Sequence, residues 1–169
     1  MRIIFVDGYN VVNSWPNLKD AKVVSYEAAR LKLIDSLQNY ASYKDCRIFL
    51  VFDAHKVKGS LEKVEKVGNL SIVFTKDGET ADSYIERKVN DIGRKTEVFV
   101  VTSDSLEQQT VFQRGAVRMS SIEFYHEVLN IEGSIRKKSH KLKHGKSDKL
   151  EDRIKEDVRE KLEKIRRSH

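Results

Sequence analysis

Five short and continuously apolar runs mark the first 120 residues of the chain. They are rich in β-branched and aromatic residues and show no alternation of polar and apolar positions. Runs of this length and composition predict strands that are buried on both faces of a sheet. The expected strands are Arg2–Val6, Arg47–Phe52, Leu70–Thr75, Glu97–Val101 and Ala116–Met119.

Between these runs the apolar positions recur at intervals of three and four, which is typical of helices packed on one side. Ser25 is the expected N-cap of a helix that runs to about residue 43, and its expected core stripe is Leu31, Ile34, Leu37 and Ala41. Thr80 is the expected cap of a helix to about residue 92, with the stripe Ala81, Tyr84, Ile85 and Val89. Further helices are predicted over 105–114 and from Ser121 to about 129, and an exposed loop over 55–69.

The regular alternation of strands and helices predicts an α/β fold in which helices cover both faces of a parallel sheet. Right-handed crossover connections and a central position for the most apolar strands favour the strand order 3-2-1-4-5. In this order strand 1 lies beside strand 4, at the point where the chain reverses its direction of travel across the sheet.

The last forty residues differ from the rest in charge. Residues 1–130 contain 18 Lys and Arg against 18 Asp and Glu, whereas residues 131–169 contain 14 against 8 and hold the whole net charge of +6. A flexible linker is expected over 133–149, followed by an amphipathic helix with the stripe Leu150, Ile154, Val158, Leu162 and Ile165. We therefore predict a compact domain over residues 1–135 and a basic tail over 136–169, which suits a polyanionic partner such as nucleic acid.

No apolar run approaches the roughly 20 residues that a membrane-spanning helix needs. The apolar start of the chain is interrupted by Asp7, so it is too short for a signal peptide. Cys46 has no second cysteine to pair with, which agrees with a reducing compartment. These features predict a cytoplasmic protein with no membrane partner.

Acidic residues follow each of the four predicted central strands. Asp7, Asp53 and Asp104 come directly or almost directly after strands 1, 2 and 4. The connection after strand 3 carries Asp77, Glu79 and Asp82. Since ligands of open parallel sheets bind beyond the carboxyl ends of the strands, we expect several of these carboxylates to share one site.

Clustered carboxylates repel one another unless a cation is bound between them. Mg²⁺ and Mn²⁺ prefer such hard oxygen ligands, and a bound ion can activate water and orient a phosphodiester. The alternative is that each aspartate only caps a helix or shapes a turn, as aspartate often does after a strand. Asn10 and Ser103, with Thr102, are candidates for orienting a phosphate or water, and His55 is either a proton carrier or an ordinary loop residue.

Four motifs together resemble the bacterial YacP proteins of the NYN group of PIN-like nucleases. They are IIFVDGYNVV at Ile3–Val12, FDAH at Phe52–His55, GETAD at Gly78–Asp82 and VVTSD at Val100–Asp104. The resemblance implies a three-layer PIN-like domain and cleavage of RNA by an endonuclease that depends on a divalent metal. It also implies a role in messenger RNA decay in association with ribosomes.

Transferred position by position, the resemblance makes Asp7, Asp82 and Asp104 the expected catalytic and metal-binding residues. Asn10, Asp53, Glu79 and Ser103 are the expected supporting residues. For the basic tail, the expected RNA-binding residues are Arg136, Lys137, Lys138, Lys141, Lys143 and Lys146.

Two other classes of function stay open at this stage. One is an RNA- or ribosome-binding module whose acidic cluster is structural. The other is a phosphatase or a 5′-nuclease acting on DNA, although the D-G-Y-N sequence after strand 1 differs from the D-x-D of aspartyl-phosphate enzymes.

Overall fold

The computed structural model describes residues 1–54, 58–103 and 115–168, without the side chains of residues 146–152 and 154. The helix predicted over 105–114 lies outside the described residues. The strands are β1 (Ile3–Asp7), β2 (Arg47–Phe52), β3 (Lys63–Val67), β4 (Leu70–Phe74), β5 (Val98–Val101) and β6 (Val117–Met119). The helices are α1 (Gly8–Ser14), α2 (Pro16–Val24), α3 (Tyr26–Lys44), α4 (Ala81–Ile92) and α6 (Ser121–Arg167).

The strands form one sheet in the order β3-β4-β2-β1-β5-β6. β1 pairs in parallel with β2 and β5, and the outer parallel pairs are β2 with β4 and β5 with β6. The five predicted strands and their order are therefore confirmed. The carboxyl ends of β1 and β5 lie side by side, where the connections leave the sheet in opposite directions.

The prediction of a loop throughout residues 55–69 is wrong for Lys63–Val67. These residues form β3, which pairs antiparallel with β4 at one edge of the sheet. The strand is short, exposed and rich in lysine, as edge strands often are, because charged side chains discourage pairing with another chain. Such a strand lacks the continuous apolar run by which the buried strands were found.

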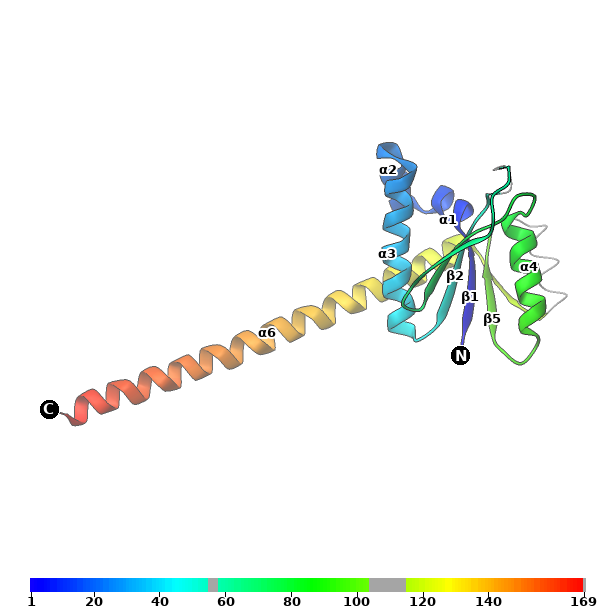
Figure 1. Cartoon of the computed structure of the whole chain (residues 1–169). Coiled ribbons are helices and arrows are strands. Elements are labelled where there is room, and N and C mark those ends of the chain that lie inside the picture. Colours follow the sequence, from blue (N-terminus) through cyan, green and yellow to red (C-terminus); the bar gives the residue numbers. More distant parts are fainter. Residues whose placement is uncertain (55–57, 104–114, 169) are drawn as a thin grey trace. The chain divides into compact units, whose positions relative to one another are not determined.

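Helices cover both faces of the sheet, with α3 on one side and α4 on the other (Figure 1). The stripe predicted for α4 is confirmed, since Ala81, Tyr84, Ile85 and Val89 are all buried. They pack in a core cluster with apolar residues of the central strands, among them Phe5 and Val51. Burial raises the pKa of Tyr84 to about 12.

The N-cap predicted for α3 is confirmed, because the Ser25 hydroxyl accepts the backbone N–H of Ala28 at 2.9 Å. The predicted stripe is wrong in part. Leu31 is 58% exposed, whereas Leu33, on the other side of the expected stripe, is fully buried. Leu31 is three residues before Ile34, and Leu33 is four residues before Leu37. Both spacings are helical, so the periodicity alone does not decide which of the two leucines faces the core.

Two short helices between β1 and α3 are absent from the sequence-based prediction. Trp15 joins them, and Pro16 occupies the first turn of α2, where its missing N–H costs no helical hydrogen bond. The Trp15 indole is buried and donates to the carbonyl oxygen of Ser121 at 2.9 Å. This contact fixes the turn between α1 and α2 to the first residue of α6.

The chain divides into two compact units, Met1–Ile131 and Glu132–His169. The prediction of a flexible linker over 133–149 is wrong, because these residues belong to the continuous helix α6. The domain boundary near residue 135 stays a prediction. No helix within the described part of the chain is both long and apolar enough to cross a membrane.

Candidate active site at the carboxyl edge of the sheet

Asp7 is the last residue of β1 and also caps the helix that follows. Its Oδ1 accepts the backbone N–H of Asn10 at 3.3 Å, which satisfies one of the free donors at the start of α1. The side chain is only half buried, so its carboxylate lies at the surface of the carboxyl edge. Capping and catalysis are alternative roles for this aspartate in the sequence, and the structure places Asp7 where it can perform both.

Asn10 connects this turn to the strand beside it. Its side-chain oxygen accepts a short hydrogen bond from the hydroxyl of Ser103, which lies two residues beyond the end of β5. Thr102, which lies between the end of β5 and Ser103, is buried. Its N–H donates to the carbonyl oxygen of Met119 at 3.3 Å. Three predicted site residues, Asp7, Asn10 and Ser103, are thus brought together beyond the ends of β1 and β5, although Asn10 and Ser103 are 93 residues apart in sequence.

Asp53 follows β2 at the same edge and is half buried. The backbone beside it is held by Thr75, a buried residue just past β4. The Thr75 hydroxyl accepts the N–H of Ala54 at 2.9 Å, and the Thr75 N–H donates to the carbonyl oxygen of Phe52 at 3.1 Å. Thr75 therefore fixes the direction in which the chain leaves β2.

Asp82 is exposed in the first turn of α4, two residues after the N-cap Thr80. Glu79 differs from it, because it is buried and paired. Its Oε1 accepts the Arg87 Nε at 3.0 Å, while its buried Oε2 has no hydrogen-bond partner. The hydrogen bond with Glu79 raises the pKa of Arg87. We infer that Glu79 shapes the connection that carries Asp82.

Asp104 and His55 lie outside the described residues. Among the residues that the structure does describe, no three of the types His, Cys, Asp and Glu are close enough to hold a metal ion. Asp7, Asn10 and Ser103 supply the hard oxygen donors that Mg²⁺ and Mn²⁺ prefer, but only one of them is a carboxylate. The donor set fits a divalent ion in kind, and further carboxylate ligands are needed to complete it.

Two tyrosines near Asp7 belong to the candidate site and were not predicted from the sequence. Tyr9 is 40% exposed, and its ring centroid is 5.4 Å from that of Tyr26. Burial raises the pKa of Tyr26, and the nearby Tyr9 and the charge of Asp7 raise it further. The Tyr26 hydroxyl is buried without a hydrogen-bond partner. The D-G-Y-N sequence was a signal for Tyr9, but no pattern pointed to Tyr26.

Gly8 allows the tight turn between β1 and α1. A Cβ atom at this position would lie 2.5 Å from the Cε1 of Phe52, which is closer than real contacts allow. The aromatic ring at the end of β2 therefore requires a residue without a side chain directly after Asp7.

The model of the YacP-like NYN domain matches residues 4–167 of the chain. The chain belongs to this family. The protein YacP of Bacillus subtilis, described as uncharacterized, is 43% identical to this YacP-like chain over 143 residues, which are 84% of each protein. The crystal structure of Rae1 (YacP) from Bacillus subtilis has a TM-score of 0.75 at 41% identity and covers 99% of this chain and 95% of that one. The crystal structure of a mutant form of the same protein has a TM-score of 0.73 at 39% identity, and the match covers 84% of each chain.

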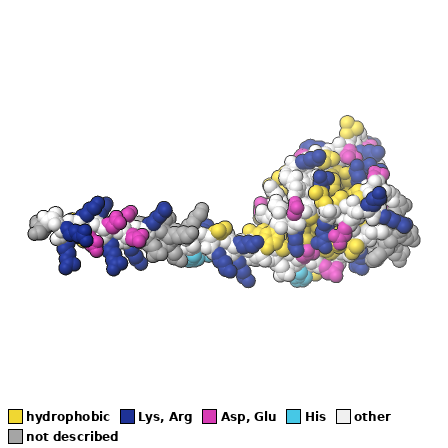
Figure 2. Space-filling view, turned by 90° about the horizontal axis from the view of Figure 1, so that it is seen from below, with side chains coloured by type: hydrophobic (Ala, Val, Ile, Leu, Met, Phe, Trp, Pro, Cys, Tyr) yellow, Lys and Arg dark blue, Asp and Glu magenta, His cyan; other side chains and the backbone are white. Residues whose placement is uncertain are grey.

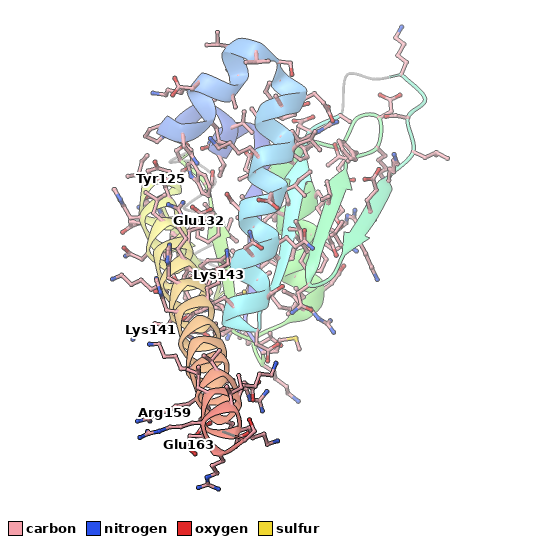
Figure 3. All side chains as sticks on the ribbon, turned by 90° about the vertical axis from the view of Figure 1, so that its left-hand side faces the viewer. Tyr125, Glu132, Lys141, Lys143, Arg159 and Glu163 are labelled. Atoms are coloured by element: carbon pink, nitrogen blue, oxygen red, sulfur yellow. The ribbon has the colours of Figure 1, made fainter. Side chains whose placement is uncertain are left out.

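The basic residues of the YacP-like tail lie on α6. Arg136, Lys137, Lys138, Lys141 and Lys143 are exposed, and the side chain of Lys146 lies outside the described residues. Figure 3 shows Lys141 and Arg159 extending away from the helix ribbon. Lys and Arg side chains outnumber the acidic ones along this helix (Figure 2), so its surface is positively charged as the composition predicts.

Proposed function

We propose that this YacP-like protein is an endoribonuclease that depends on a divalent metal ion. The observation that carries the proposal is the junction of Asp7, Asn10 and Ser103 beyond neighbouring strands, at the point where the connections diverge. Sites of open α/β sheets form at such points. Membership of a family of NYN domains, which are generally nucleases, supports the same conclusion.

In this proposal Asp7, Asp82 and Asp104 hold Mg²⁺ or Mn²⁺ and are the catalytic residues. The ion would supply a nucleophilic water and neutralise charge on the phosphate. Asn10 and Ser103 orient the phosphodiester or the attacking water through their side-chain oxygen and hydroxyl. Asp53 adds negative charge to the same edge. Glu79 supports the site by fixing the connection before α4 through its ion pair with Arg87.

The substrate of the proposed enzyme is messenger RNA, cut in association with ribosomes in the cytoplasm, as the family resemblance implies. The exposed cations of α6 would bind the phosphate backbone. They are Arg136, Lys137, Lys138, Lys141, Lys143 and Lys146. Binding of this kind is independent of sequence and releases counterions, so it predicts a strong dependence on salt.

A second candidate is an RNA- or ribosome-binding module that does not cleave. The capping bond between Asp7 and Asn10 favours it, because this bond gives the aspartate a structural task that needs no metal. The two candidates differ in one respect, which is whether RNA is cut.

The test is cleavage of labelled RNA by the full chain, with and without Mg²⁺ or Mn²⁺, both free and bound to ribosomes. Asp7→Asn is compared with Asp91→Asn, which removes an exposed charge near the end of α4, at the opposite edge of the sheet. We expect metal-dependent cleavage by the wild type and the Asp91 variant and none by the Asp7 variant. Binding without cleavage in all three proteins would favour the second candidate.

A further inference from the structure

A groove of about 370 Å³ lies between α3 and the strands β3 and β4. Its lining is half apolar and half charged, and the apolar part includes Leu31 and Ile34 of α3 and Phe74 of β4. Figure 3 shows α3 crossing the face of the sheet on which the groove lies. The predicted core stripe of α3 included Leu31 and Ile34, so the groove explains why these residues are apolar although they are not part of the core.

Aromatic rings connect the groove to the candidate active site. The centroid of Phe74 is 5.6 Å from that of Phe52, the last residue of β2. Phe52 is 5.5 Å from Tyr9, which follows Asp7 by two residues. Both phenylalanines end their strands, so Phe74, which lines the groove, lies at the same edge of the sheet as Asp7. A strand of RNA bound at Asp7 therefore has a short route to the groove.

The charges of the groove are balanced. Arg30 pairs with Glu27, and the Nζ of Lys63 lies 2.6 Å from the Oε1 of Glu65. Two cations compensated by two carboxylates do not attract a phosphate strongly. The groove is therefore better suited to a neutral, flat and polar group than to an anion.

The groups that line the groove match the surfaces of a nucleobase. The Arg30 guanidinium carbon lies 5.4 Å from the centroid of Phe74, and guanidinium and aromatic planes are surfaces on which unpaired bases stack. The hydrogen bond with Lys63 lowers the pKa of Glu65, so its carboxylate is ionised and only accepts hydrogen bonds. The ion pair with Lys63 leaves further acceptor positions on that carboxylate. Among the bases, guanine presents two adjacent N–H groups on its Watson–Crick edge, which two carboxylate oxygens can accept.

We propose that this groove binds one unpaired guanine base of the RNA substrate, close to the bond that is cut. The proposal rests on the proposed function for the identity of the substrate. It assigns stacking to the Arg30 guanidinium, which itself lies over the ring of Phe74, and recognition of the N–H groups to Glu65 with Glu27. The groove thus contributes base preference to a protein whose other RNA contacts are with the backbone.

The experiment measures binding rather than cleavage, so that it does not depend on catalysis. The full chain with Asp7→Asn is titrated in EDTA with short single-stranded RNAs that contain one guanine, or inosine or adenine at the same position. Inosine lacks the 2-amino group of guanine. We expect affinity to fall about fivefold for inosine and further for adenine.

Two variants and a control locate the effect. In the same background, Glu65→Gln should remove the preference for guanine over inosine, and Arg30→Met should weaken binding of all three RNAs about fivefold. Lys32→Met removes a cation of α3 that does not line the groove. This variant should change neither the preference for guanine nor the affinity for the three RNAs. Melting curves check that each variant is folded, and Glu65 on β3 gives a test independent of α3.

Equal affinities for the three RNAs would overturn the proposal, and so would equal effects of the Arg30 and Lys32 variants. Both results are expected if the groove binds a protein side chain instead of a base. Failure of the proposed function gives a different result. A wild type that never cuts RNA but prefers guanine through Glu65 would disprove the nuclease and retain the base site.

Discussion

The Asp7 carboxylate contributes both a helix cap and a negative charge, and one substitution separates the two contributions. Asparagine caps a helix about as well as aspartate, so Asp7→Asn keeps the bond to the Asn10 N–H and removes the charge. We expect RNA cleavage to be lost while the melting temperature stays the same or rises, since repulsion from nearby carboxylates is relieved. Asp7→Ala should also lose cleavage but cost about 1 kcal/mol of stability. Cleavage at the wild-type rate by the Asp7→Asn variant would show that this carboxylate is not catalytic.

Gly8 gives a second test at the scale of single residues. Gly8→Ala places a methyl group against the ring of Phe52, and we expect a loss of about 1–3 kcal/mol in the free energy of unfolding measured with urea. Gly133→Ala is the matched control, because a Cβ added at this position of α6 would meet no neighbouring atom within 4 Å. Alanine is the better helix former, so the control should be neutral or stabilising. Equal effects of both changes would mean that the turn after Asp7 can relax.

At the scale of elements, the sequence predicts the buried strands and the exposed strand β6 but fails at two other partly exposed features. The central strands and the stripe of α4 follow directly from continuous apolar runs and from a clear period. Edge strand β3 and the face of α3 do not, because Val64 and Leu31 are partly exposed and their patterns fit more than one arrangement. The site shows the same limit, since positions after strands were predicted but the ring of Tyr26, brought in by α3, was not.

The connection between β4 and α4 depends on the ion pair of Glu79 with Arg87. Arg87→Met leaves a buried carboxylate without its cation, and we expect a loss of about 1–3 kcal/mol in the free energy of unfolding. The double variant Glu79→Gln with Arg87→Met should recover part of this loss. A double-mutant cycle by urea unfolding gives the coupling energy, expected at about 1 kcal/mol. Additive effects of the two changes would show that the pair does not stabilise the connection.

For the whole molecule, the helical nature of residues 133–149 shows the limit of local patterns. The abundance of Lys, His and Ser and the absence of an apolar period predicted a linker, yet the residues continue a helix whose first turns are buried through Phe124, Val128 and Ile131. Extending a helix from turns that are already formed avoids the cost of nucleation. Lys and Arg, which are good helix formers and are frequent in this stretch, then suffice without a packed face.

Removal of residues 136–169 tests the division of tasks between the two units. The deletion takes away 14 Lys and Arg and 7 Asp and Glu, while the buried residues of α6 up to Ile131 remain. Leu142, Val158, Leu162 and Ile165 are all more than half exposed, so little apolar burial is lost and the melting temperature should be preserved. RNA affinity should fall, and its dependence on salt should become shallower, because fewer counterions are released on binding. Cleavage at saturating RNA should persist, since the acidic edge is intact. A folded truncation with an unchanged salt slope would place the RNA-binding surface on residues 1–135 instead.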